Sequence, residues 1–78
     1  MSNQDKYDKH FINLFGVEMG QLKALEYQSI ETWDSVGHMS LIVSIEEEFG
    51  ISFEMDDILD FSSYSKGIEI LNKYSIEL

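Results

Sequence analysis

The hydrophobic residues of the first segment repeat with the spacing of an α-helix. Tyr7, Phe11, Leu14 and Phe15 stand at i, i+4, i+7 and i+8, which places them on one face of a helix. Gly16 follows directly. It predicts the end of this helix, because glycine readily adopts the left-handed conformation that closes a last turn.

Residues 16–33 show only weak periodicity, so we expect a long loop there. Its apolar residues Leu22, Leu25 and Ile30 should pack the loop onto the core. A loop of this length in so small a chain is unusual and is often functional.

A second helix is predicted from Ser35 to Phe49. Asp34 can cap it, because its carboxylate can accept hydrogen bonds from the free backbone N–H groups of the first turn. Gly50 follows the last apolar residue, as a helix stop does. The core-facing stripe of this helix should consist of Leu41, Ile42, Ile45 and Phe49.

The same helix carries a second apolar stripe, formed by Val36, Met39 and Val43. It lies roughly 140° from the core stripe when each residue turns the helix by about 100°. A helix on the outside of a small bundle normally needs one apolar face. The second stripe therefore indicates either a partner-binding surface or a helix buried on both sides.

The remaining segments complete an all-α fold. Residues 51–53 have no partner strand and should be a connector, 55–60 suit a short helix, and a last helix should begin near Ser63 or Ser65. It should turn Ile68, Leu71 and Tyr74 inward. We expect one domain over residues 1–78, a small four-helix bundle with three longer helices, one short helix and a long loop between the first two.

The chain has 78 residues and no cysteine, so neither a disulfide nor a thiolate metal site can stabilise it. Its longest aliphatic run, Leu41-Ile42-Val43, is far too short to span a membrane. The N-terminal segment has no apolar core and does not resemble a signal peptide. We expect a monomer in the cytoplasm.

The net charge is −10, and its distribution is uneven. Ten acids and no Lys or Arg lie between Lys23 and Lys66. Such a surface repels nucleic acid and anionic membranes and attracts a partner protein with a basic surface. The alternative is that the charge only keeps a small protein in solution.

Ser35 has three possible roles: a helix cap, a catalytic nucleophile or an attachment point for another group. His38 lies one helical turn after it, yet the chain has no GxSxG motif and no glycine-rich oxyanion loop. We therefore expect no catalytic residues. We also expect no metal site, because the acids lack the EF-hand pattern and there is no His/Cys zinc spacing.

The segment DSVGHMSLIVSIEEEFGISF resembles the central part of acyl carrier proteins. In that family an Asp-Ser-(Leu/Val) triplet opens the second helix, which ends with acids and a Phe. The similarity extends over about residues 5–75 in helix order and is strongest over 33–51.

The resemblance implies a non-catalytic carrier. The hydroxyl of Ser35 would be esterified by 4′-phosphopantetheine, which a phosphopantetheinyl transferase takes from coenzyme A. The terminal thiol of that arm would hold acyl intermediates as thioesters for enzymes with basic surfaces. Asp34 matches the aspartate that the transferase recognises in this family. Further matches are Val36, Met39, Glu46 and Glu47 at partner-facing positions, joined by Val43 of the same stripe, and Asp56 and Asp57 on the short helix.

Several residues depart from the family pattern, among them Trp33, Gly37, His38, Ser40 and Glu54. They make a specialised polyketide, aminoacyl or surface-glycan pathway an alternative to fatty-acid synthesis. A sheltered acyl chain would enter a pocket lined by Ile45, Phe53, Ile58, Phe61, Gly67 and Ile68, with space left by Gly67. The alternative function is an acidic helical adaptor that binds a basic partner without any cofactor.

Overall fold

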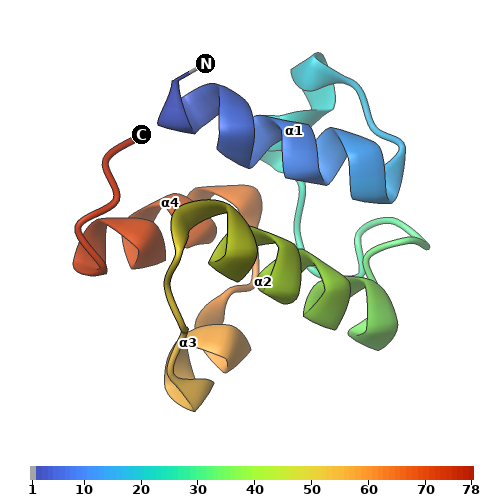
Figure 1. The fold of residues 1–78 in the computed structure, drawn as a ribbon. Coiled ribbons are helices and arrows are strands. Elements are labelled where there is room, and N and C mark those ends of the chain that lie inside the picture. Colours follow the sequence, from blue (N-terminus) through green and yellow to red (C-terminus); the bar gives the residue numbers. More distant parts are fainter. Residues whose placement is uncertain (1) are drawn as a thin grey trace.

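The computed structural model describes residues 2–78, and within them the chain forms four α-helices and one 3₁₀-helix (Figure 1). No strand forms in this part of the chain, where the only β-type pairing is one isolated bridge. The helices are α1 (Asn3–Phe15), η1 (Met19–Ala24), α2 (Ser35–Phe49), α3 (Met55–Asp60) and α4 (Tyr64–Lys73). The predicted all-α bundle is confirmed, and η1 is an addition inside the predicted loop.

The predicted helix ends are also confirmed. Asp34 caps α2 and Ser63 caps α4, each through its side chain. Gly16 and Gly50 follow α1 and α2 with φ values of 68° and 66°, which a residue with a side chain rarely adopts.

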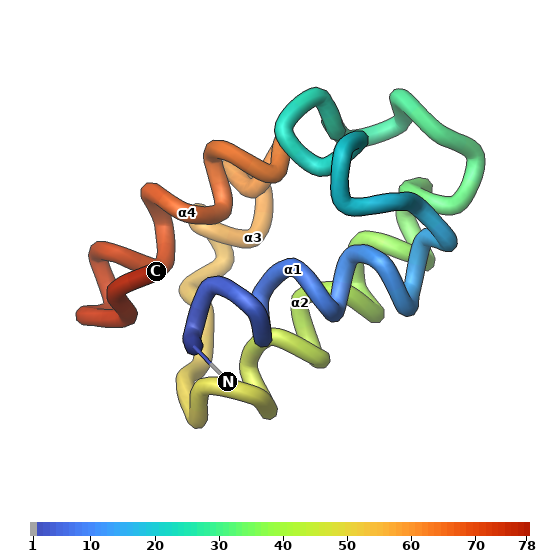
Figure 2. The backbone as a smooth tube through the Cα atoms, turned by 90° about the horizontal axis from the view of Figure 1, so that it is seen from above, coloured from blue at the N-terminus to red at the C-terminus, as the bar shows by residue number. Residues whose placement is uncertain are grey.

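The two longest helices, α1 and α2, lie side by side and run in opposite directions (Figure 1). The loop between them closes one end of the molecule, and the start of α1 and the C-terminus lie at the other end (Figure 2). There the Asn3 side-chain amide donates to the backbone carbonyl of Glu77 at 3.0 Å. The short helix α3, which has six residues, lies beneath α2 in Figure 1.

Aromatic rings fill the centre of the bundle. The ring of Phe11 lies within 6.4 Å, centroid to centroid, of five other rings, from α1, the loop before α2, the turn after α3 and the start of α4: Tyr7, Phe15, Trp33, Phe61 and Tyr64. Rings of this size bury a large apolar area per residue. This explains how a short chain without cysteine builds a core.

The buried face of α4 differs from the prediction. Leu71 is buried as expected, but Ile68 and Tyr74 are only half-buried. The buried face is formed by Tyr64, Gly67, Ile70 and Leu71. The helix is turned this way because Gly67 lies against the hydroxyl of Tyr7 and the ring of Phe61, leaving no room for a Cβ atom.

Replacing Gly67 should therefore destabilise the protein. A Gly→Ala change in a helix normally stabilises it by about 1 kcal/mol, but at position 67 the new methyl would collide with Tyr7 and Phe61. We expect Gly67→Ala to lower the free energy of unfolding by about 1–3 kcal/mol, measured by urea denaturation. Gly20→Ala is the control, because a Cβ atom at Gly20 meets nothing within 4 Å. Equal stability of the two variants would contradict this packing argument.

Candidate functional site

Ser35 is the first residue of α2, and its side chain is exposed. The carboxylate of Asp34 accepts from the backbone N–H of Gly37 at 2.8 Å. The N–H groups of Ser35 and Val36 have no acceptor within the helix, as at any helix start. An anion attached here would therefore lie near free donors and the positive end of the helix dipole.

The start of α2 also depends on Gly37. A Cβ atom at this position would collide with the backbone carbonyl of Thr32 and approach the ring of Phe15. The sequence alone predicts that Gly37 weakens the first turn of α2, because glycine has a low helix propensity. The structure shows a different role, because Gly37 allows the preceding loop to pass close to α2.

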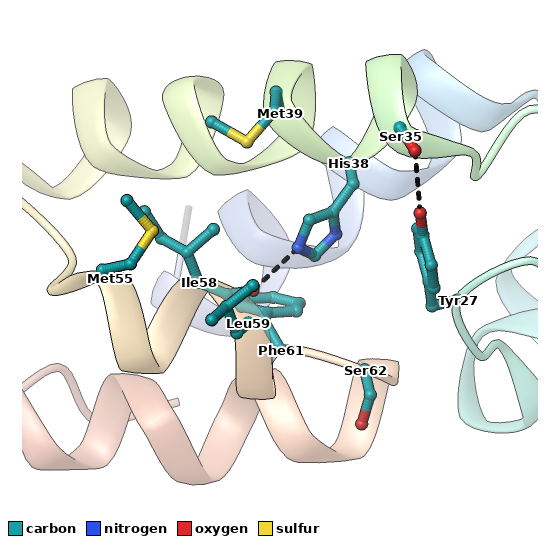
Figure 3. A pocket seen from close by; sticks show the side chains of 9 residues that line it. All are labelled: Tyr27, Ser35, His38, Met39, Met55, Ile58, Leu59, Phe61 and Ser62. Atoms are coloured by element: carbon teal, nitrogen blue, oxygen red, sulfur yellow. Dashed lines mark hydrogen bonds between the residues drawn. The ribbon is translucent and has the colours of Figure 1, made fainter.

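The hydroxyl of Tyr27, in the loop before α2, lies 3.1 Å from the Ser35 hydroxyl oxygen. Figure 3 shows the two groups pointing toward each other across the start of α2. Either oxygen can donate the proton.

A pocket of about 310 Å³ opens next to Ser35, between α2 and α3 (Figure 3). Most of its wall is apolar, and hydroxyl groups and an imidazole lie at the end near Ser35. The lining residues are Tyr27, Ser35, His38, Met39, Met55, Ile58, Leu59, Phe61 and Ser62.

Both ring nitrogens of His38 are already engaged in hydrogen bonds. Nδ1 accepts from the indole N–H of Trp33 at 3.0 Å, and Nε2 lies 2.9 Å from the carbonyl oxygen of Ile58. An indole can only donate and a carbonyl can only accept, so the ring must be the neutral Nε2–H tautomer. His38 thus has no free lone pair to act as a base for Ser35, which argues against a Ser–His nucleophile.

The second apolar stripe of α2 is exposed, with Val36 76%, Met39 48% and Val43 47% accessible. The alternative that α2 is buried on both sides is therefore wrong. Met55 and Leu59 of α3 are exposed as well, which the sequence analysis did not anticipate. Because Met39, Met55 and Leu59 also line the pocket, the exposed apolar surface continues to the pocket mouth.

The predicted partner-facing acids differ in their surroundings. Glu47 and Asp56 are exposed. Glu46 is half-buried, and its carboxylate accepts from the backbone N–H of Phe53 at 2.8 Å. Asp57 corrects our expectation, because it is only 5% exposed.

Asp57 is buried because it joins α3 to the end of α4. Its two carboxylate oxygens accept from the Lys73 ammonium and from the Tyr74 hydroxyl. The hydrogen bond from Lys73, followed by that from Tyr74, lowers the pKa of the Asp57 carboxyl. Asp57 therefore acts within the fold and is not available to a partner.

The predicted acyl pocket also needs correction. Only Ile58 and Phe61 line the pocket beside Ser35. Ile45 and Phe53 are buried in the core, and Ile68 lines a separate hollow formed with α1 and η1. At Gly67 the expected space is filled by Tyr7 and Phe61.

The structure shows no cluster of three or more His, Asp or Glu side chains arranged to hold a metal ion within residues 2–78. Among the helices of this described range, none is long and apolar enough to cross a membrane.

In a comparison with protein-family models, residues 33–66 match the model of the phosphopantetheine attachment site, which describes a phosphopantetheine-binding domain. The matched segment begins at Trp33 and includes Ser35, all of α2 and α3 and the start of α4. Neither the curated proteins nor the solved structures include a match to the chain.

A phosphopantetheine-binding domain is the attachment site of covalently bound 4′-phosphopantetheine, so the predicted cofactor and the resemblance to acyl carrier proteins are confirmed at this level. The domain marks a carrier that works with a transferase and with other enzymes. The residues present fit such a group, since an exposed hydroxyl, free helix N–H groups and a pocket adjoin one another at the start of α2.

The sequence did not reveal the roles of two residues near Ser35, Tyr27 before the matched segment and Trp33 at its start. Tyr27 lies in a loop without periodicity, and nothing in the sequence links it to Ser35. Trp33 stood out as a departure from the family pattern, but its complete burial was not expected.

The lowered pKa of Asp57 predicts a specific dependence of stability on pH. The ionised carboxylate stabilises the fold above its unfolded-state pKa of about 3.9, and this contribution disappears as the pH falls through the lower pKa of the folded state. We expect Asp57→Asn to be less stable than the unmodified protein at neutral pH, with the difference shrinking below about pH 4. Urea denaturation across this pH range measures it.

Asp60→Asn serves as the control for that experiment, because it removes an exposed carboxylate from the same helix. A stability difference for Asp57→Asn that stays constant from neutral to acid pH would contradict the assigned role of the carboxylate.

Proposed function

We propose that Ser35 carries the 4′-phosphopantetheine group and that the whole chain is one carrier domain for acyl intermediates. The observation that carries this proposal is the exposed Ser35 hydroxyl at the first turn of α2, inside the matched segment. Other serines in the segment have different surroundings. Ser63, for example, caps α4 with its hydroxyl.

Neighbouring groups support attachment at Ser35. The free N–H groups and dipole of α2 favour the negative charge of a phosphodiester at this position. Asp34 holds the turn by accepting from Gly37. Its resemblance to the aspartate that the transferase reads makes it our candidate for recognition during loading.

When bound, the arm supplies a thiol on which an acyl group is held as a thioester. This chemistry suits a chain that has no cysteine of its own. The protein residues have a different task, since they orient the attachment point, offer a short apolar pocket and present a surface to enzymes. We propose no catalytic role for any of them.

The pocket beside Ser35 bears on which acyl groups the protein carries. Phe61 lines this pocket and also belongs to the buried core, where its ring lies against Gly67. A core filled in this way favours short acyl groups that remain near the surface. We therefore propose a specialised polyketide, aminoacyl or surface-glycan pathway as an alternative to fatty-acid synthesis.

We propose that enzymes meet the protein at the exposed stripe Val36, Met39 and Val43. Glu47 and Asp56 are the exposed acids at our candidate positions. The apolar residues would supply desolvated contact, and the acids would attract basic side chains of the partner.

Loading can be tested by intact mass. Incubation with coenzyme A and a broad-specificity phosphopantetheinyl transferase should add one phosphopantetheine group, and Ser35→Ala should abolish the addition. Ser62→Ala, which removes the other serine that lines the pocket, should still be loaded. Addition to the Ser35→Ala variant would disprove the assignment of the site. No addition with several transferases would favour a cofactor-free acidic adaptor.

The partner surface predicts that charge and shape act on different rates. Glu47→Lys with Asp56→Lys should slow association with the transferase by roughly tenfold at low salt, and the deficit should shrink at high salt as charges are screened. Met39→Ala should instead cost about 1 kcal/mol or more of binding free energy, mainly as faster dissociation. Surface-immobilised binding kinetics across a salt series measures both.

The matched control for this series is Glu69→Lys with Glu77→Lys. It makes the same change in net charge with two exposed acids outside the matched segment. If this control slows association as much as the first pair, the acids act only through net charge and the proposed surface is wrong.

A further inference from the structure

The position of Tyr27 is set by its backbone. Its N–H donates to the carbonyl of Ser62 at 2.8 Å, and the N–H of Tyr64 donates to the carbonyl of Leu25 at 3.1 Å. These two bonds form an antiparallel bridge between the long loop and the turn before α4. The backbone of Tyr27 is therefore anchored to Ser62, which is distant from it in the sequence.

The side chain of Tyr27 is also held in place. Its ring packs edge-on against His38, with centroids 5.3 Å apart and planes at 64°. His38 is itself kept in one orientation by Trp33 and Ile58. The hydroxyl is thus directed at the Ser35 hydroxyl, 3.1 Å away, by contacts that do not involve Ser35 (Figure 3).

The hydrogen bond between Tyr27 and Ser35 is not needed to begin the helix. Asp34 already caps α2, with its side chain accepting from Gly37 and its carbonyl accepting from His38. The bond acts on the Ser35 hydroxyl itself, because it favours one orientation of a side chain that would otherwise rotate freely in solvent.

We propose that Tyr27 is a positioning residue for the loading of Ser35. We further propose that, after loading, its hydroxyl donates a hydrogen bond to an oxygen of the phosphodiester. This inference rests on the proposed function, because it requires Ser35 to be the attachment point.

In the loading step the Ser35 hydroxyl oxygen forms a bond to the phosphorus of coenzyme A that bears the pantetheine. The phosphoanhydride bond of coenzyme A breaks, adenosine 3′,5′-bisphosphate leaves, and the hydroxyl proton passes to a basic group of the transferase. Tyr27 neither gains nor loses a proton in this step. It holds the attacking oxygen in one direction, which lowers the cost of reaching a reactive geometry.

The bonding of Tyr27 changes once Ser35 is esterified. The Ser35 oxygen then has no proton to donate, and its lone pairs are those of a weakly accepting ester. The adjoining non-bridging phosphate oxygens carry the negative charge and are stronger acceptors. Since the Tyr27 hydroxyl stays within reach of the start of α2, it is placed to donate to one of them.

The experiment compares Tyr27→Phe with the unmodified protein in transferase kinetics. This change removes the hydroxyl and retains the ring that packs on His38. We expect kcat to fall roughly three- to tenfold, the effect of one neutral hydrogen bond, with KM for the carrier unchanged. Tyr74→Phe is the control, since it deletes a hydrogen-bonded hydroxyl at the far end of α3. It should lower the melting temperature without changing kcat.

A second readout does not depend on turnover. Phosphorus NMR of the loaded protein reports the surroundings of the phosphodiester. The resonance should shift between the unmodified protein and Tyr27→Phe, and it should stay in place in Tyr74→Phe.

These outcomes separate the two proposals. If the unmodified protein is loaded at Ser35 and Tyr27→Phe changes neither kcat nor the phosphorus resonance, the Tyr27 inference is wrong and the carrier function stands. A raised KM with an unchanged resonance would also overturn it, because Tyr27 would then contact only the transferase. If the unmodified protein is not loaded at Ser35, the proposed function itself fails.

Discussion

The burial of Trp33 is the constraint on which the functional end of this bundle depends. Its indole is 0% exposed, stacks on Phe15 at 5.2 Å and meets the edge of Phe11. Asp34 and Ser35 follow it directly in the chain, so the start of α2 is set by a ring locked in the core. Ser35 is exposed and yet held in position, because Trp33, two residues earlier, cannot move without opening the aromatic cluster.

The same indole determines the chemistry of its neighbour. By donating to Nδ1 of His38, Trp33 leaves Nε2 to donate to the carbonyl of Ile58. The neighbouring residue Asp57 also holds α3 in place, through Lys73 and Tyr74. A helix of six residues is too short to be stable alone. The pocket wall therefore owes its position to polar contacts from both sides, and not to the helix propensity of α3.

Local patterns were sufficient to predict much of this molecule. Helix spacing, Asp34 as a cap and Gly50 as a stop follow from interactions within a few residues, and the structure agrees with them. The errors concern contacts between distant segments. Gly67 seemed to leave space, but the ring of Phe61 fills it, and Asp57 seemed to be a surface acid, but α4 covers it. The partnership of Tyr27 with Ser35 likewise needs a bridge between distant parts of the chain, which no periodicity reveals.

Trp33 also makes the start of α2 observable by fluorescence. It is the only tryptophan in the chain, so the intrinsic fluorescence at long excitation wavelength originates from one place, two residues before Ser35. Its indole N–H is bonded to His38, whose ring also packs against Tyr27. A change at Ser35 thus reaches the fluorophore through Tyr27 and His38. The unlabelled protein carries its own optical reporter at the end of the bundle where Ser35 lies.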